Sequence, residues 1–378
     1  MSSENVANKT SQTKIGDAQE ILRHHLECLW ADPAKAGDLP PLMMWGPPGI
    51  GKSTIIRELT EELDIGFIDV RLAQREPVDI RGLPVPRDDR QGVDWIIASE
   101  WPRESQEGFK TRGIILFDEI TAADPSLQVA AYELILDRRL GTLYNVPEGW
   151  YIVAAGNRTK DGAVARAMSS ALANRFCHLE LAEDSKGWVE WGWKNGIHPS
   201  VLGFIRFRPD LLLNMTGNRE RGWPSPRTWA RVSLEMQLAE TTGLSERALS
   251  HIIEGLIGVG ASIEFQGFRN WADKLPDIEG ILRGDEKITI PERSDQRYAL
   301  ISALVTHILE EPDIGVIMNG IFDVLLAFTN DWCQVAYHDI QLTLTARGRL
   351  KDLTLLTTHP RHEDLEEKIL GEIPESEG

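Results

Sequence analysis

The chain has 378 residues, 42% hydrophobic and 26% charged, which fits a folded protein of two or three domains. Its net charge of −18 argues against a protein that coats nucleic acid, which needs a basic face, although 40 Lys and Arg leave room for a local basic groove. The N-terminus is polar and no stretch approaches the ~18 apolar residues of a membrane span, so we expect neither a signal peptide nor a membrane segment. Three widely spaced cysteines, Cys28, Cys177 and Cys333, indicate reduced thiols and a cytoplasmic protein.

The first half of the chain alternates short apolar strands with helices. Residues 1–15 are polar and are expected to form a disordered tail, and a helix is predicted over 18–30. Apolar strands are predicted at 42–45, 67–71, 113–117 and 150–155. A helix over 54–63 follows the first of them. This alternation predicts an α/β domain over residues 16–182, with a parallel sheet flanked by helices.

Two predicted hairpins interrupt the alternation. Between Asp79 and Thr111, two apolar runs flank a polar turn at residues 88–92, which is a hairpin pattern. A second, shorter hairpin is predicted before the strand at 150–155, and no Lys or Arg lies between its Leu140 and Glu148. Isolated insertions of this kind are usually surface loops.

Strand patterns become rare after residue 183, and the rest of the chain reads as helical. We predict a helical lid domain over 183–275 and a helical C-terminal extension over 276–378 with an acidic, frayed end. The extension is expected to hold two long helices, at 295–310 and 315–335. Five tryptophans gather around the lid, and their helical spacing favours core packing over stacking on adenine: Trp188, Trp191, Trp193, Trp223 and Trp229.

A complete G-x-x-x-x-G-K-[ST] phosphate loop follows the strand at 42–45 and precedes a helix. In such a loop, glycines let backbone N–H groups converge on phosphates, the lysine neutralises their charge, and the following hydroxyl can bind Mg²⁺. The predicted ATP-binding residues are Gly46, Pro47, Pro48, Gly49, Ile50, Gly51, Lys52, Ser53 and Thr54.

The strand at 113–117 ends in an acid pair, Asp118 and Glu119. Downstream of a phosphate loop, such a pair indicates a metal-side carboxylate and a second carboxylate that activates water. We therefore predict that Ser53 and Asp118 hold Mg²⁺ and that Glu119 is the catalytic base. An ATPase is favoured over a small-molecule kinase, which shares only the phosphate loop.

Five segments together resemble an AAA+ ATPase. They are Gly-Pro-Pro-Gly-Ile-Gly-Lys-Ser, Leu-Phe-Asp-Glu, Ala-Ala-Gly-Asn ending at Asn157, Ala-Asn-Arg-Phe around Arg175, and Pro-Ser-Pro-Arg-Thr-Trp around Arg227. Within that class the sequence is similar to the MoxR-like family, in the clade that carries a helix-2 insert and a pre-sensor-1 hairpin. The two predicted hairpins fall where that clade has them. The resemblance covers about residues 40–235 and does not extend to the C-terminal third.

The resemblance implies roles for three further residues. Asn157 corresponds to the sensor-1 residue beside the γ-phosphate, Arg175 to an arginine finger offered to a neighbouring subunit, and Arg227 to the sensor-2 arginine of the lid. Arg158 and Arg166 are alternatives for the finger. Arg158 also stands where many MoxR relatives have proline.

The function implied by the resemblance is a ring-forming ATPase, expected to be a hexamer, that remodels a protein partner. A protein with a von Willebrand factor A domain is the partner class that the family suggests. The alternative is a nucleic-acid motor or a nuclease-associated ATPase, since related insert-bearing ATPases act there. The lack of basic residues between Leu140 and Glu148 favours a protein partner over nucleic acid.

Overall fold

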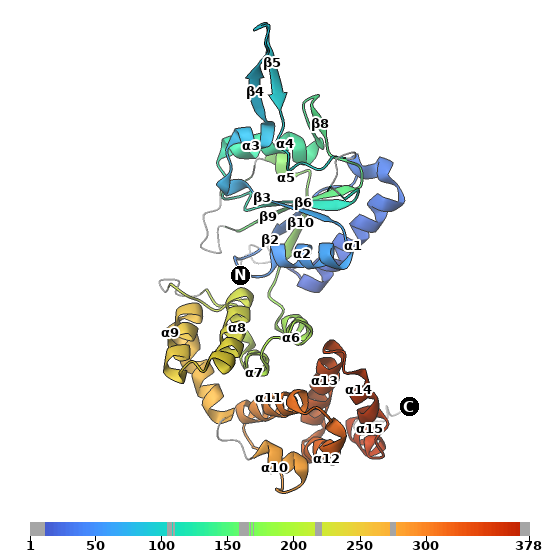
Figure 1. Cartoon of the computed structure of the whole chain (residues 1–378), viewed down its shortest axis with the longest axis vertical. Coiled ribbons are helices and arrows are strands. Elements are labelled where there is room, and N and C mark those ends of the chain that lie inside the picture. Colours follow the sequence, from blue (N-terminus) through green and yellow to red (C-terminus); the bar gives the residue numbers. More distant parts are fainter. Residues whose placement is uncertain are drawn as a thin grey trace, which may run out of the picture. The chain divides into compact units, whose positions relative to one another are not determined.

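The structure, a computed structural model, describes residues 12–103, 108, 110–158, 166, 168, 170–215, 221–272 and 277–370. The chain divides into two compact units, which meet between Asp184 and Ser185. The first unit contains the sheet and the second is helical (Figure 1). The further division of the helical part into a lid and an extension stays a prediction.

The first unit is an α/β domain built on a six-stranded parallel sheet. Its strand order is β1-β10-β2-β9-β6-β3. The sheet strands are β1 (Gln12–Thr13), β2 (Leu42–Trp45), β3 (Gly66–Arg71), β6 (Gly113–Asp118), β9 (Trp150–Gly156) and β10 (Cys177–Leu181). The helices of this unit are α1 (Ile15–Ala31), α2 (Lys52–Glu62), α3 (Pro77–Arg81), α4 (Pro125–Leu136) and α5 (Ser170–Ala173). The predicted fold class, an AAA+ P-loop sheet flanked by helices and followed by a helical region, is confirmed.

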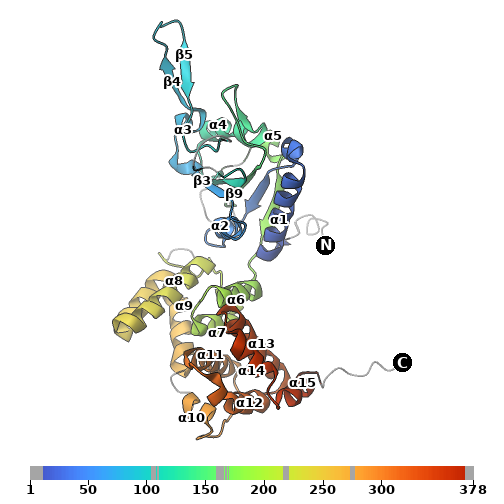
Figure 2. The ribbon, with the colours of Figure 1, turned by 45° about the vertical axis from the view of Figure 1, so that its right-hand side comes forward.

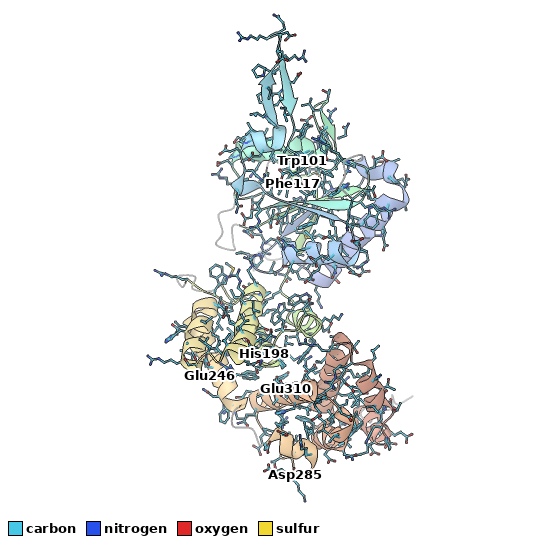
Figure 3. All side chains as sticks on the ribbon, viewed as in Figure 1. Trp101, Phe117, His198, Glu246, Asp285 and Glu310 are labelled. Atoms are coloured by element: carbon cyan, nitrogen blue, oxygen red, sulfur yellow. The ribbon has the colours of Figure 1, made fainter. Side chains whose placement is uncertain are left out.

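The central strands are apolar because both of their faces are covered. All seven residues of β9 are buried, as expected for a parallel sheet with helices on both sides. At one end of the sheet the Trp150 ring lies flat against two glycines. A β carbon at Gly66 or Gly113 would approach that ring to 2.4 or 2.5 Å, so larger residues would force β3 and β6 away from it. Trp101 and Phe117, labelled in Figure 3, belong to the same core with ring centroids 6.3 Å apart.

Both predicted hairpins are present in this unit. In the first, β4 (Leu83–Pro86) pairs antiparallel with β5 (Val93–Ile96), and Figure 2 shows this hairpin extending away from the sheet. In the second, β7 (Arg139–Leu140) pairs with β8 (Tyr144–Asn145). The Tyr144 hydroxyl donates to the carbonyl of Pro102, 2.9 Å away, so the second hairpin is fastened to the segment that returns from the first.

Two strands of the first unit, β1 and β10, were not predicted from the sequence. Gln12 and Thr13 pair in parallel with β10, so part of the expected disordered tail is a strand, while residues 1–11 lie outside the described residues. The strand β10 itself was not predicted. Its apolar positions, Leu179 and Leu181, alternate with polar ones, and the strand is only five residues long.

The second unit has a single apolar core that extends from α6 to α15. Its helices are α6 (Ser185–Lys194), α7 (Pro199–Phe207), α8 (Pro226–Thr242), α9 (Glu246–Ala272), α10 (Ile278–Arg283), α11 (Ser294–Glu310), α12 (Met318–Ala327), α13 (Asn330–Ala346), α14 (Leu350–Thr357) and α15 (His362–Leu370). Trp193 and Trp229 are 3% and 0% exposed, so the predicted core packing of the tryptophans is confirmed for these two.

The long helix predicted over 315–335 is wrong, because the structure breaks it between α12 and α13. Thr329 has extended backbone angles (φ −68°, ψ 161°) and stands at the N-cap of α13, a position that threonine favours. The acidic end is also more ordered than predicted, since α15 covers residues that were expected to fray; residues 371–378 lie outside the described part.

Within the part of the chain that the structure describes, one helix is long and apolar enough to cross a membrane by length and composition alone, namely Glu246–Trp271 within α9. A buried helix of a water-soluble protein passes the same test. Ile253, Phe265 and Phe268 of this helix lie in the core of the second unit, and Gly258 has non-helical backbone angles that kink it. Core packing therefore accounts for part of its apolar sequence.

Candidate active site

The predicted catalytic segments of the first unit meet at one edge of the sheet. The phosphate loop follows β2, Asn157 follows β9, and Glu119 follows β6. Because β9 lies between β2 and β6 and all three strands are parallel, their carboxyl ends stand side by side. Ligands of open α/β sheets bind at this edge.

The phosphate loop joins β2 to α2. Gly49 and Gly51 have φ angles of 84° and 115°, in the region that residues with a β carbon rarely adopt. Lys52 is 7% exposed, and its ammonium donates to the carbonyls of Gly46 at 2.7 Å and Pro47 at 3.1 Å. The lysine is therefore held over a loop whose backbone N–H groups, together with the N-terminus of α2, favour phosphate.

Ser53 and Asp118 lie together, as a metal site requires. The Ser53 hydroxyl donates to Oδ2 of Asp118 across 2.6 Å, although the two residues are 65 positions apart in sequence. A hydroxyl and a carboxylate are hard oxygen donors of the kind that Mg²⁺ prefers, and Mg²⁺ completes its shell with water and phosphate oxygens. These residues fit the metal ion that accompanies ATP. Elsewhere in the described residues, no group of three or more His, Cys, Asp or Glu could hold a metal.

Glu119 occupies a strained position directly after the strand. Its φ is +56°, which is uncommon for a residue other than glycine, and its backbone N–H donates to Oδ1 of Asp118 at 2.8 Å. The turn directs the two adjacent carboxylates differently: that of Asp118 is tied to Ser53, whereas Glu119 is exposed. Strain of this kind is typical of catalytic positions. An exposed carboxylate beside the metal-side acid is suited to orient and deprotonate an attacking water.

Asn157 is oriented by two groups. Its side-chain Oδ1 accepts from Nζ of Lys52 at 2.9 Å, which places the predicted sensor residue beside the phosphate loop. Its backbone is held by Thr121, whose hydroxyl accepts from the Asn157 N–H at 3.2 Å and donates to its carbonyl at 3.3 Å. Thr121 is 2% exposed and lies two residues after Glu119, so it joins the ends of β6 and β9. Thr121 was not predicted from the sequence, where its only signal is its position just after the acid pair.

Of the three arginines considered for the finger, Arg175 is the one left available. Arg158 pairs with Glu180 of β10 at 3.1 Å and is 16% exposed, and Arg166 pairs with Asp124. Arg175 is exposed, and the described residues contain no ion pair to it. The geometry therefore favours Arg175 as a finger for a neighbouring molecule.

Arg227 lies in the helical unit, at the second position of α8. Ser225 caps this helix, and the side chains of Ser225 and Thr228 satisfy each other's backbone N–H groups in a capping box. Trp229 is buried, and its indole N–H donates to the carbonyl of Leu211 at 2.7 Å. The local sequence thus starts a helix and anchors it, with Arg227 exposed. Its contact with the γ-phosphate stays a prediction.

The phosphate loop with its buried lysine and the Ser53–Asp118 pair are the parts that ATP hydrolysis with a metal ion requires, and they meet at one edge of a parallel sheet. Residues 41–176 match the family model of the AAA domain, dynein-related subfamily. The chain therefore contains an AAA domain and is an ATP hydrolase that uses ATP with a metal ion, generally Mg²⁺.

Other comparisons add little. A search of curated protein sequences finds no match. The RuvB Holliday junction branch migration motor of Thermotoga maritima is 18% identical, with 78% of this chain and 84% of that chain covered and a TM-score of 0.35. NtrX of Brucella abortus is 16% identical, with 91% of this chain and 68% of that chain covered and a TM-score of 0.34. Likenesses at this level carry no argument about the function of this chain.

Proposed function

We propose that this chain is a ring-forming, MoxR-like ATPase, assembled as a hexamer, that uses hydrolysis to remodel a protein partner. A ring is supported by Arg175, which is exposed and would complete the active site of a neighbouring subunit. The partner class implied by the family resemblance is a protein with a von Willebrand factor A domain. Three free cysteines support a cytoplasmic location, which cell fractionation would test.

The observation that carries the protein-remodelling proposal is the apolar surface of the first hairpin. Leu83, Val93, Trp95 and Ile96 are between 43% and 60% exposed on two short strands that extend from the sheet, with Val93 and Trp95 on one face of the hairpin and the paired Leu83 and Ile96 on the other. Exposed apolar clusters of this kind are typical of protein-binding sites. The charges at the hairpin do not favour nucleic acid, because Arg87 is paired with Asp94 at 2.8 Å and Arg90 follows two aspartates.

The edges of the hairpin also support an extended polypeptide as its ligand. The Arg87 N–H donates to the Gly92 carbonyl, so Arg87 and Gly92 form a hydrogen-bonded pair of the ladder. Because such pairs alternate with non-hydrogen-bonded ones, the backbone groups of the pairs Pro84–Trp95 and Pro86–Val93 point outward. The outer edge of β4 thus presents two prolines without N–H, whereas β5 presents the complete backbone groups of Val93 and Trp95. An added strand would therefore pair with β5 and not with β4.

The test uses a permanently unfolded, carboxymethylated protein as the probe, with binding to Glu119→Gln rings in ATP measured by fluorescence anisotropy. Trp95→Ser with Ile96→Ser should weaken binding about tenfold or more, because exposed anchors carry most of an interface's energy. Val93→Pro should do the same, since it removes an outward N–H without touching the β4–β5 ladder. Basal ATP hydrolysis should stay unchanged in both variants.

The matched control is Val259→Ser with Ile263→Ser, which removes two residues of α9 that are 47% and 66% exposed. That variant should bind the probe like the parent. An equal loss of probe binding in the hairpin variants and in this control would contradict a specific role of the hairpin. Tight binding of an oligonucleotide at physiological salt, lost with the hairpin changes, would instead support the nucleic-acid motor.

A further inference from the structure

His178, which belongs to no sequence motif, contacts both the residue before the phosphate loop and the helix end before Arg175. It lies on β10, next to β2, whose last residue Trp45 directly precedes the phosphate loop. The Trp45 indole N–H donates to Nδ1 of His178 at 2.8 Å, and the two rings stack with centroids 6.0 Å apart and planes 22° apart. On its other side, His178 Nε2 lies 2.7 Å from the carbonyl of Ala173.

These two contacts together fit one tautomer of the ring. An indole nitrogen only donates and a carbonyl only accepts, so Nδ1 must be the acceptor and Nε2 must carry the proton. The neutral Nε2–H tautomer satisfies both partners at once. Phenylalanine would keep the stacking on Trp45 and lose both hydrogen bonds.

Ala173 is the last residue of α5 and opens the turn that presents Arg175. In this turn the Arg175 N–H donates to the Leu172 carbonyl at 3.1 Å, and Phe176 donates to Ala173 at 3.3 Å. Phe176 is 7% exposed and anchors the far side of the turn in the core. The carbonyl that receives the His178 proton therefore belongs to the turn that sets the direction of Arg175.

We propose that His178 is a positioning residue that couples the phosphate loop of a subunit to the arginine finger which the same subunit offers to its neighbour. A shift of the loop on nucleotide binding moves Trp45, and the chain Trp45–His178–Ala173 carries that shift to Arg175. The inference rests on the proposed function, in which Arg175 acts on the nucleotide of a second copy of this chain.

Mixed assemblies separate this role from a general effect on the fold. In the reference mixture, Arg175→Ala subunits keep an intact pocket, and Glu119→Gln subunits hold ATP and supply an intact finger. Turnover should return when the two are combined. Placing His178→Phe in the finger-supplying Glu119→Gln subunit should lower the recovered turnover about tenfold, because a finger displaced by about an ångström loses much of its effect.

The reciprocal mixture places His178→Phe in the Arg175→Ala subunit, where the pocket is used and the finger is already absent. Its recovered turnover should stay within about twofold of the reference, because the relay serves the subunit that gives the finger. A merely structural role would lower both mixtures alike, and that result would overturn the proposal. His251→Phe, an exposed histidine of α9, is the matched control and should change neither mixture.

A second variant guards against misfolding of His178→Phe. Trp45→Phe keeps an aromatic ring and removes only the indole N–H, so it should reproduce the loss in the finger-supplying subunit. Combining it with His178→Phe should add little, since both changes break the same chain of contacts. Full additivity of the two losses would contradict a shared pathway.

A comparison of two finger donors, one with ATP in its pocket and one without, tests whether nucleotide binding affects the finger. Lys52→Ala subunits, whose pocket cannot hold ATP, should recover less turnover as finger donors than Glu119→Gln subunits, and His178→Phe should erase that difference. Equal recovery by the two donors would overturn the coupling. If the reference mixture of Arg175→Ala and Glu119→Gln subunits recovers no turnover, the finger in trans is itself refuted. That result is obtained without any change at His178, so it is distinct from a failure of the coupling.

Discussion

The two units of this chain are built on different principles. In the α/β unit, polar side chains from distant positions meet at the ends of three strands, with contacts such as Ser53–Asp118 and Lys52–Asn157. In the helical unit, ten helices share one apolar core, and its most buried ion pair joins Arg206 to Asp339 among the described residues. Chemistry constrains the residues of the first unit, whereas shape and burial constrain those of the second. Changes at the strand ends of the first unit should therefore act on turnover, and changes in the second unit, apart from the predicted sensor Arg227, should act on stability.

The largest effect on turnover is expected at the phosphate loop and its base. Lys52→Ala should abolish ATP binding, because Lys52 neutralises the phosphates in the ground state. Glu119→Gln should still bind ATP but hydrolyse it on the order of 10³-fold more slowly, because a base acts mainly in the transition state. Calorimetry for binding and phosphate release for turnover separate the two roles. Near-normal turnover of Glu119→Gln would show that another group activates the water.

Arg175→Ala should lower turnover about 10³-fold without weakening ATP binding, as expected for a finger that stabilises charge in the transition state. Activity of the parent should rise more than linearly with protein concentration, since each site needs a neighbour. Arg166→Ala is the control, because Arg166 is paired with Asp124. A linear dependence on concentration, with assembly followed by light scattering, would contradict a finger in trans.

The sequence predicted the parts of the site that lie within contiguous motifs. Lys52, Ser53, Asp118 and Asn157 converge as expected, because the parallel strands that precede them end at the same edge of the sheet. Thr121 escaped prediction, since its clamp on Asn157 exists only after two separate strands have paired.

The strand β10 and the break between α12 and α13 were also not predicted from the sequence. The strand β10 depends on pairing with β2 across more than 130 residues, and its own five residues alternate in a way that a surface loop also shows. Periodicity predicted the apolar helices of the second unit but not the break before Asn330, because two consecutive apolar helices continue the same pattern. Local sequence patterns predict individual helices and strands well, but they predict poorly which distant segments pair with one another.

Thr121→Val tests whether the join between β6 and β9 matters for catalysis. Valine keeps the volume of this buried side chain but leaves the Asn157 N–H without its acceptor. We expect kcat to fall about tenfold with little change in KM, because Asn157 would be displaced only slightly. Thr121→Ser restores the hydroxyl and should recover most of the activity. An unchanged kcat in Thr121→Val would mean that β9 alone positions Asn157.

The smallest effect on turnover is expected in the helical unit, at Asp339 of α13. Burial raises the pKa of this carboxyl to about 6, and the neighbouring Arg206 offsets only part of that rise. Because the folded state then holds the proton more readily than the unfolded chain, stability should fall as pH increases from about 4 to about 6 and change no further above that. The expected loss is about 3 kcal/mol, measured by urea unfolding of the full chain.

Asp339→Asn should remove this dependence of stability on pH, because an amide does not ionise. This holds whatever the effect of the substitution on stability at a single pH. The matched control is Asp323→Asn, whose carboxylate forms an exposed ion pair with Arg361 at 2.6 Å and is 54% exposed. That variant should keep the slope of the parent, since an exposed pair contributes little to stability. If Asp339→Asn also keeps the slope, other groups set the pH dependence. If it instead lowers ATP turnover at neutral pH, where the parent is stable, the separation of chemistry in one unit from packing in the other fails.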